Sequence, residues 1–195
     1  MSNSFVYAQE IYYSSGFNHT TYQFSGTDGL PLQLRSKMGR FHEMGYRLLI
    51  DEKRLQYGIG LAFNNFDAWG GDIANNYEWE TNFLGINNVL EYTLSDSSTT
   101  GRLELLVGLQ LQIMHIINGQ QNINGALFDL MKEDEFIGLW IQPGILLTSK
   151  YHINEALHVS FGYNYSMGFN FFNLTEEKLR LSNHQLRFGL HFSIN

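Results

Sequence analysis

The feature that most limits the possible folds of this chain is a strict alternation of apolar and polar residues over unusually long segments. From Leu157 to Phe171, every odd position holds an apolar or aromatic residue, while the even positions hold His, Ser, Gly or Asn. The same alternation runs through Gln185–Asn195. Because successive side chains of a strand point to opposite faces, each of the two sets lies on one face of a β-strand.

The rest of the chain follows this pattern more loosely. It predicts eight strands, at about 7–24, 38–50, 54–68, 79–95, 101–118, 136–153, 156–171 and 183–195. These strands are longer than the ~5–6 residues usual in soluble sheets, and they reach the ~9–11 residues needed to cross a bilayer at a tilt. No run approaches the ~18 apolar residues of a membrane-spanning helix, so a helical membrane protein is excluded.

The connections between the predicted strands alternate in length. Short turns are expected at 51–53, 95–100 and 154–155, and longer polar stretches near 25–37, 69–78, 119–135 and 172–182. Transmembrane barrels have an even number of strands, short periplasmic turns and longer extracellular loops. We therefore predict an all-β fold, an eight-stranded antiparallel up-and-down transmembrane β-barrel. Its loops are expected to be extracellular, and its turns and both termini periplasmic.

The whole chain, 1–195, is predicted to form this single domain. The segment Phe5–Gln9 resembles the tail of a signal peptide, with Ala8 and Gln9 placed like a cleavage site. Residues 1–9 are therefore expected to be a signal-peptide remnant. The alternative, a strand that simply begins there, stays open.

The polarity of the two strand faces separates a membrane barrel from a soluble one. The apolar face is nearly continuous, whereas the opposite face carries too many ionisable groups for the dry core of a soluble barrel. That face holds Glu43, Arg47, Glu91, Glu104, Gln110, Gln112, Lys150, His158, Arg187 and His191. Glycines gather on it as well, at 16, 45, 58, 60, 85, 108, 138, 144, 162, 168 and 189. We assign it to the lumen, where missing side chains make room in a narrow barrel.

Three segments carry a resemblance to a known group of proteins: Gly58–Phe63, Phe161–Tyr165 and Leu186–Phe192. In their pattern of residues they resemble strands of the small eight-stranded outer-membrane barrels of the OmpA-like transmembrane type, above all the variants found in Bacteroidetes. The resemblance implies residence in the outer membrane of a Gram-negative bacterium. Such barrels usually end on an aromatic residue, whereas this chain ends Phe192-Ser193-Ile194-Asn195. Members include adhesins, lipid-modifying enzymes and accessory subunits, so the resemblance implies a location and leaves the activity open.

The charged residues of the lumenal face form the first candidate site. We predict a lumenal charge network of Glu43, Arg47, Glu91, Glu104, Lys150, His158, Arg187 and His191. Pairing across tight turns is expected to bring Glu91 close to Glu104 and Lys150 close to His158, and Glu104 could then meet Lys150. One interpretation is a gated ion path or a proton-active site. We favour a structural ion-pair network, because eight strands leave an interior only wide enough for side chains.

Enzymatic and metal sites find less support in the sequence. Deacylase barrels of similar architecture carry a His-x-Ser-Asn motif, whereas this chain has His158-Val159-Ser160 followed by Phe161. Acidic residues gather in the third long loop, from Asp129 to Glu135, but they lack the alternating pattern of a calcium loop. We therefore predict no catalytic residue, no metal site and no cofactor, and we keep a lipid A-modifying enzyme as an alternative.

Apolar residues in two long loops form the last candidate site. The segment 124–136 could form about two helical turns with one apolar face, and the first loop has similar apolar content. Residues that could bind a partner there are Leu30, Leu32, Leu127, Phe128, Leu130 and Met131. Exposed apolar surface usually marks a contact, although the loops could instead pack on one another and cap the barrel.

The expected function is that of a non-enzymatic structural or accessory subunit of a larger outer-membrane complex, with recognition through the long loops. A narrow channel is a further alternative. The expected partners are outer-membrane lipid, lipopolysaccharide and other outer-membrane proteins. Nucleic acid is excluded as a partner by the net charge of −7. The lack of cysteine excludes disulfides and thiol chemistry.

Overall fold

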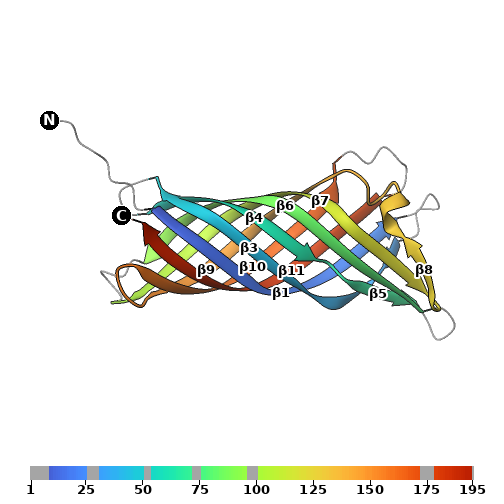
Figure 1. The fold of residues 1–195 in the computed structure, drawn as a ribbon, viewed down its shortest axis with the longest axis horizontal. Helices are drawn as coiled ribbons and strands as arrows, with labels where there is room; N and C mark the ends of the chain where they lie inside the picture. The colour runs from blue at the N-terminus through green and yellow to red at the C-terminus, as the bar shows by residue number, and fades with distance from the viewer. Residues whose placement is uncertain are drawn as a thin grey trace.

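The computed structural model describes residues 9–25, 31–50, 54–71, 76–95, 101–171 and 178–194. These residues form an elongated barrel whose strands run obliquely to its long axis (Figure 1). In the described ranges, no helix has both the length and the apolar character needed to span a membrane.

Eight long strands form a closed antiparallel ring. They are β1 (Gln9–Ser25), β3 (Arg35–Leu49), β4 (Leu55–Asn65), β6 (Asn76–Ser95), β7 (Leu103–Ile123), β9 (Leu139–His152), β10 (Leu157–Asn170) and β11 (Lys178–Ile194). Each strand pairs with the next one in this order, and β1 closes the ring by pairing with β11 from Gln9 opposite Ile194 to Ser25 opposite Lys178. The predicted fold, an eight-stranded up-and-down barrel, is confirmed.

The two ends of the barrel differ in their connections. At one end, called the turn end, β1 begins, β11 ends, and short segments join β3 to β4, β6 to β7 and β9 to β10. The turn between β9 and β10 is held by Asn154, whose side-chain oxygen accepts hydrogen bonds from the backbone N–H groups of Ala156 and Leu157. The opposite end, called the loop end, has the longer connections. The predicted turn at 51–53 lies outside the described residues, as does the turn predicted at 95–100 except for Ser95, which ends β6.

Much of the sequence expected to be loop is strand instead. Short strands β2 (Pro31–Gln33), β5 (Ala68–Gly71) and β8 (Ala126–Asp129) extend the wall at the loop end, and β7 and β11 reach five residues beyond their predicted bounds. The helical turns expected at 124–136 are wrong. Asn124 and Gly125 have positive φ and join β7 to β8 as a two-residue hairpin, a turn for which Asn-Gly is the favoured pair. Only Leu130–Lys132 is helical, as the 3₁₀ turn η1.

The outer surface carries the apolar face of the strands. Its exposed side chains include Ile11, Phe17, Met44, Leu61, Ile86, Leu109, Ile145, Phe161, Phe188 and Leu190. Several outward polar groups are bonded by a tyrosine hydroxyl of the neighbouring strand. Tyr13 contacts His42 Nδ1 at 2.8 Å, and Tyr163 contacts His184 Nδ1 at 2.6 Å. Such pairing is what a lipid-facing surface requires, because lipid supplies no hydrogen-bond partner.

The interior is divided into two layers along the barrel axis. Toward the turn end lies the polar layer, which contains the predicted charge network. Toward the loop end lies a cluster of buried apolar side chains, called the apolar plug: Tyr22, Leu34, Phe66, Ala68, Trp79, Phe83, Met114, Ile116, Leu130, Phe136, Trp140, Leu179 and Leu181. Aromatic rings meet across the lumen there, with centroids 5.1 Å apart for Trp79 and Phe136 and 5.5 Å apart for Phe83 and Trp140.

Glycines on the inward face leave the space that this crowded interior needs. A Cβ on Gly45 would clash with the backbone oxygen of Ile59 and would lie 2.6 Å from the Tyr12 ring. The inward assignment holds for the glycines that lie in strands. Gly138 is an exception, because it precedes β9 and has a φ of +112°. Its role is to let the chain turn into β9, since a positive φ favours glycine.

Candidate functional site

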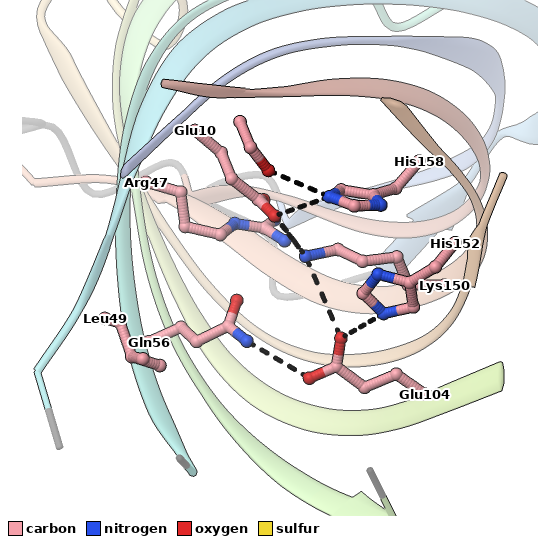
Figure 2. Close-up of a pocket in the computed structure, with 9 residues that line it drawn as sticks. Glu10, Arg47, Leu49, Gln56, Glu104, Lys150, His152 and His158 are labelled. Atoms are coloured by element: carbon pink, nitrogen blue, oxygen red, sulfur yellow. Dashed lines mark hydrogen bonds and ion pairs between the residues drawn. The ribbon is translucent and has the colours of Figure 1, made fainter. Parts of the chain in front are cut away.

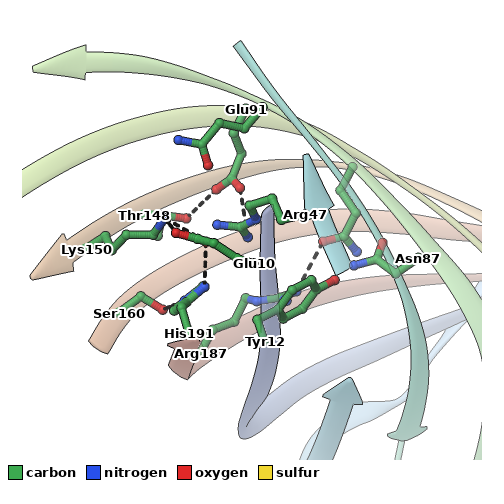
Figure 3. Close-up of polar contacts among 12 residues, drawn as sticks. Glu10, Tyr12, Arg47, Asn87, Glu91, Thr148, Lys150, Ser160, Arg187 and His191 are labelled. Carbon is green, nitrogen blue, oxygen red and sulfur yellow. Dashed lines mark hydrogen bonds and ion pairs between the residues drawn. The ribbon is translucent and has the colours of Figure 1, made fainter. Parts of the chain in front are cut away.

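The polar layer contains two deeply buried carboxylates, Glu43 and Glu91, and Figure 3 shows Glu91 with its partners Arg47 and Thr148. Glu43, on β3, accepts hydrogen bonds from the Tyr12 hydroxyl at 2.7 Å and from Asn87 at 2.9 Å. It also forms an ion pair at 3.0 Å with Arg187 of β11, which is two strands away in the ring. Each carboxylate oxygen therefore has a donor, as a buried charge requires.

The second buried carboxylate belongs to Glu91 on β6. It pairs with Arg47 of β3 at 2.9 Å and accepts a hydrogen bond from Thr148 of β9 at 2.9 Å. The Arg47 guanidinium lies over the Tyr12 ring, 5.1 Å from its centroid. Two guanidinium nitrogens of Arg47, Nε and Nη1, are buried without a protein partner in the described structure.

Glu10, on β1, is the residue that joins the polar layer across the ring. Lys150 of β9 donates to both of its carboxylate oxygens, at 2.9 and 3.0 Å. Two histidines lie next to it, with His158 Nε2 at 3.8 Å and His191 Nδ1 at 3.5 Å. The predicted network did not include Glu10, because this residue adjoins the segment assigned to a signal peptide. Its inward orientation was nevertheless readable, since Glu10 has the same parity along β1 as Gly16.

Glu104 forms the part of the polar layer nearest the turn end. It accepts hydrogen bonds from Thr93 at 2.9 Å and Gln56 at 3.3 Å, and it lies 3.2 Å from His152 Nε2. Its carboxylate is also 4.0 Å from Lys150 Nζ. The contact expected between Glu104 and Lys150 is therefore present.

The contact expected between Glu91 and Glu104 is absent. The register places Glu91 opposite Gly108, with an irregularity between Thr93 and Ser95 that shifts the pairing. The carboxylates consequently have separate partners. Lys150 and His158 are brought together through Glu10, to which both are close.

A cavity of about 260 Å³ opens among these groups at the turn end (Figure 2). It is lined by Glu10, Arg47, Leu49, Gln56, Glu104, Lys150, His152, His158 and Ser193. Both signs of charge face it, so it is a polar vestibule without a bias toward anions or cations. Within the described ranges, no group of three or more His, Asp or Glu side chains could hold a metal ion.

One arrangement near the vestibule has the residue types of a hydrolytic triad. Ser160 Oγ lies 2.8 Å from His191 Nε2, and Glu10 lies on the other side of the same imidazole ring. A Cβ on Gly189 would collide with Ser160 Oγ, so glycine at this position is required for the contact. The cavity lining includes Glu10 but neither Ser160 nor His191.

The residues predicted to bind a partner have different environments. Leu127 and Phe128, on β8, are 69% and 49% exposed. Leu130 is 1% exposed in the apolar plug, and Met131 is packed against the plug, so Leu130 has no surface for a partner. Leu30 lies outside the described residues, and Leu32 belongs to β2.

Charged side chains on the outer wall at the loop end form a separate group. Lys37 donates hydrogen bonds to Glu78 and, at 3.0 Å, to Glu80. Partial burial disfavours the ammonium ion, but these two carboxylates outweigh burial and hold the pKa of Lys37 above its usual value. This group ties the start of β3 to the loop-end part of β6.

No protein-family model matches this sequence, and the comparison with curated proteins finds no match. Among solved structures, Neisserial surface protein A aligns with a TM-score of 0.50 at 13% identity, covering 93% of this chain and 96% of that protein. Ail, the attachment invasion locus protein of Yersinia pestis, aligns with a TM-score of 0.43 at 11% identity, covering 94% and 98%. The outer membrane protein AlkL gives 0.41 at 12% identity, covering 100% and 95%.

At such low identity, the likeness to Neisserial surface protein A concerns the fold alone. The narrower resemblance to OmpA-like barrels of Bacteroidetes stays a prediction. The closed ring, the apolar outer surface and the polar layer inside agree with that fold. The chain therefore has the architecture of the small eight-stranded outer-membrane β-barrels.

Proposed function

We propose that this barrel is a non-enzymatic structural or accessory subunit of a larger outer-membrane complex, which recognises its partner at the loop end. The observation that carries the proposal is the exposed apolar pair Leu127 and Phe128 on the β7–β8 hairpin. Large exposed apolar side chains above the lipid-facing belt have no lipid to contact, and such surface marks an interaction site. In this proposal the loop end is extracellular and the turn end periplasmic.

The hairpin is held firmly enough to act as a recognition surface. β8 pairs with β7 from Gln120 opposite Asp129 to Ile123 opposite Ala126. Directly after β8, the Asp129 side chain caps η1 by accepting a hydrogen bond from the backbone N–H of Met131, and Leu130 enters the apolar plug. Because this segment is ordered before a partner arrives, binding pays little conformational entropy.

The test is site-specific photo-crosslinking in cells. A photoreactive amino acid replaces Phe128 in one strain and Glu155, an exposed residue of the turn end, in the control strain. We expect a discrete adduct with one outer-membrane protein from position 128 and none from 155. A third strain combines crosslinking at Leu127 with Phe128→Asp, which should abolish the adduct while the folded barrel still migrates faster on gels before boiling. Equal labelling from 128 and 155, or an adduct that survives Phe128→Asp, would contradict the proposal.

The narrow channel is disfavoured by the apolar plug, which fills the lumen with rings in edge-to-face contact. Ions do not pass through such a layer without water. Planar-bilayer recordings of the purified barrel should show no stable openings. Clear, long-lived openings would replace the subunit proposal with a channel.

A second candidate function is acyl hydrolysis of lipid A, favoured by the contact between Ser160 and His191. In that mechanism His191 would take the Ser160 proton, and Glu10, 3.5 Å from the other ring nitrogen, would stabilise the imidazolium that forms. Mass spectrometry of lipid A from cells with and without the barrel decides the matter. Loss of an acyl chain that disappears in Ser160→Ala would establish the enzyme, and an unchanged mass would remove it.

A further inference from the structure

A groove of about 550 Å³ runs along the outer wall at the loop end, over β10, β11 and the neighbouring part of β1. Its lining includes Tyr165, Met167 and Phe169 from β10, Arg180 and Ser182 from β11, and Gln23 from β1. The register places Phe169 opposite Arg180 and Met167 opposite Ser182, and Arg180 in turn opposite Gln23. An apolar row on β10 thus lies directly beside a polar and basic row on β11.

The apolar row continues the lipid-facing surface. Between Tyr165 and the turn end, the same face of β10 presents Phe161 and Tyr163, which are 49% and 38% exposed. Met167 and Phe169 carry this row toward the loop end and are 55% and 39% exposed. On β11, by contrast, the outward apolar residues stop at Leu186, and His184, Ser182 and Arg180 follow. The groove therefore spans the level at which the wall changes from apolar to polar.

Among the described residues, the outer wall formed by β1, β10 and β11 carries charge of one sign. In β1, β10 and β11, the only acidic residue is Glu10, which points into the lumen. Arg180 is exposed on this wall, and no carboxylate of the described residues forms an ion pair with it. The outward face of β6 differs, because it carries Glu78 and Glu80. Positive charge beside an apolar row is thus a local property of the β10–β11 face.

These features match a lipid that has a phosphate group and acyl chains. A guanidinium presents parallel N–H donors that fit a phosphate, and at a membrane surface it is less hydrated than an ammonium. Acyl chains would lie along Tyr165, Met167 and Phe169, where they exclude water from the apolar row. We propose that this groove binds a phosphorylated, acylated lipid of the loop-end leaflet, with the phosphate on Arg180. The proposal rests on membrane residence but not on a protein partner at β8.

The test measures lipid binding to the purified full chain in detergent by native mass spectrometry. The probes are hexa-acylated lipid A with two phosphates and the same lipid with both phosphates removed. Arg180→Gln is compared with Arg40→Gln, which removes another exposed arginine, from β3 outside the groove. We expect the phosphorylated lipid to bind the unaltered chain, Arg180→Gln to weaken it about tenfold, and Arg40→Gln to change it less than about twofold.

Other occupants give different results. If Arg180→Gln and Arg40→Gln weaken lipid A binding equally, the lipid is attracted to the wall as a whole, and the proposal of a binding groove is refuted. If the dephosphorylated lipid binds as tightly as the phosphorylated one, the phosphate does not contribute to binding. Displacement of the lipid by millimolar inorganic phosphate, or a Met167→Gln variant that binds lipid A as well as the unaltered chain, would mean a site for the anion alone. An acidic peptide that competes with lipid A for the groove would indicate a protein ligand instead. Faster gel migration before boiling confirms that each variant has folded.

Discussion

Replacement of Glu10 by Gln should destabilise the barrel, because it leaves the buried ammonium of Lys150 without its main partner. The substitution keeps the size of the side chain but removes the charge that Lys150 contacts through two hydrogen bonds, at 2.9 and 3.0 Å. Lys150 is 1% exposed, so its ammonium cannot turn to bulk water. The remaining carboxylate, Glu104, is 4.0 Å away and already has several hydrogen-bond partners.

The size of the effect follows from these contacts. Removing one partner of a buried ion pair costs about 3–5 kcal/mol. The vestibule beside Glu10 and the nearby Glu104 favour the lower end, about 3 kcal/mol. With a urea dependence of about 2 kcal/mol per molar, the unfolding midpoint should fall by about 1.5 M.

The assay is urea unfolding in phospholipid vesicles, followed by tryptophan fluorescence. Glu155→Gln, an exposed change at the same end, is the control and should shift stability by less than about 0.5 kcal/mol. Lys150→Met and the double variant complete a thermodynamic cycle. Because the double variant leaves no unpaired ammonium, its cost should be about 2 kcal/mol less than the sum of the single costs. Costs that add within about 0.5 kcal/mol would refute the reasoning, since they would mean that the two groups are not coupled.

Two further predictions concern packing and use the same unfolding assay. Gly45→Ala should cost about 2 kcal/mol or more, because its Cβ would meet the Tyr12 ring at 2.6 Å, whereas Gly58→Ala, whose nearest neighbour is 3.6 Å away, should be neutral or slightly stabilising. Equal effects would show that the inward face is not crowded at β3. Leu130→Ala should cost about 2–4 kcal/mol through the cavity left in the apolar plug, while Leu127→Ala should change stability by less than about 0.5 kcal/mol. A large loss of stability in Leu127→Ala would instead mean that Leu127 packs against the barrel and contributes to its fold.

The ring of strands could be predicted because its signal is local. The two-residue period, clearest in 157–171, can be recognised without knowledge of the neighbouring strands. The same period in the other strands predicts the inward positions of Glu43, Arg47 and Glu91. Which inward residues meet across the lumen depends on how far each strand slides against the next. That slide depends on details such as the irregularity at Thr93 and Ser95.

Two misjudged segments have different causes. Glu10 was missed because the sequence before it also suits a signal peptide, and its partners lie 140 or more residues away in the chain. The segment after Ile123 was misread because its apolar spacing suits a helix as well as a hairpin followed by a turn. The Asn124-Gly125 pair would have decided in favour of the hairpin, since both residues have positive φ.

If the loop end recognises a partner as proposed, the apolar plug gives that surface a rigid support. The long strands β6, β7 and β11 extend to the loop end, where they bury Trp79, Ile116 and Leu179. An apolar interior stabilises a wall that no lipid supports, because burial of those rings removes apolar surface from water. The plug therefore acts toward the loop end as the core of a soluble barrel, and it fixes β8 through Leu130. Such a core suits a chain that holds a rigid surface clear of the lipid, which is what the proposed function requires.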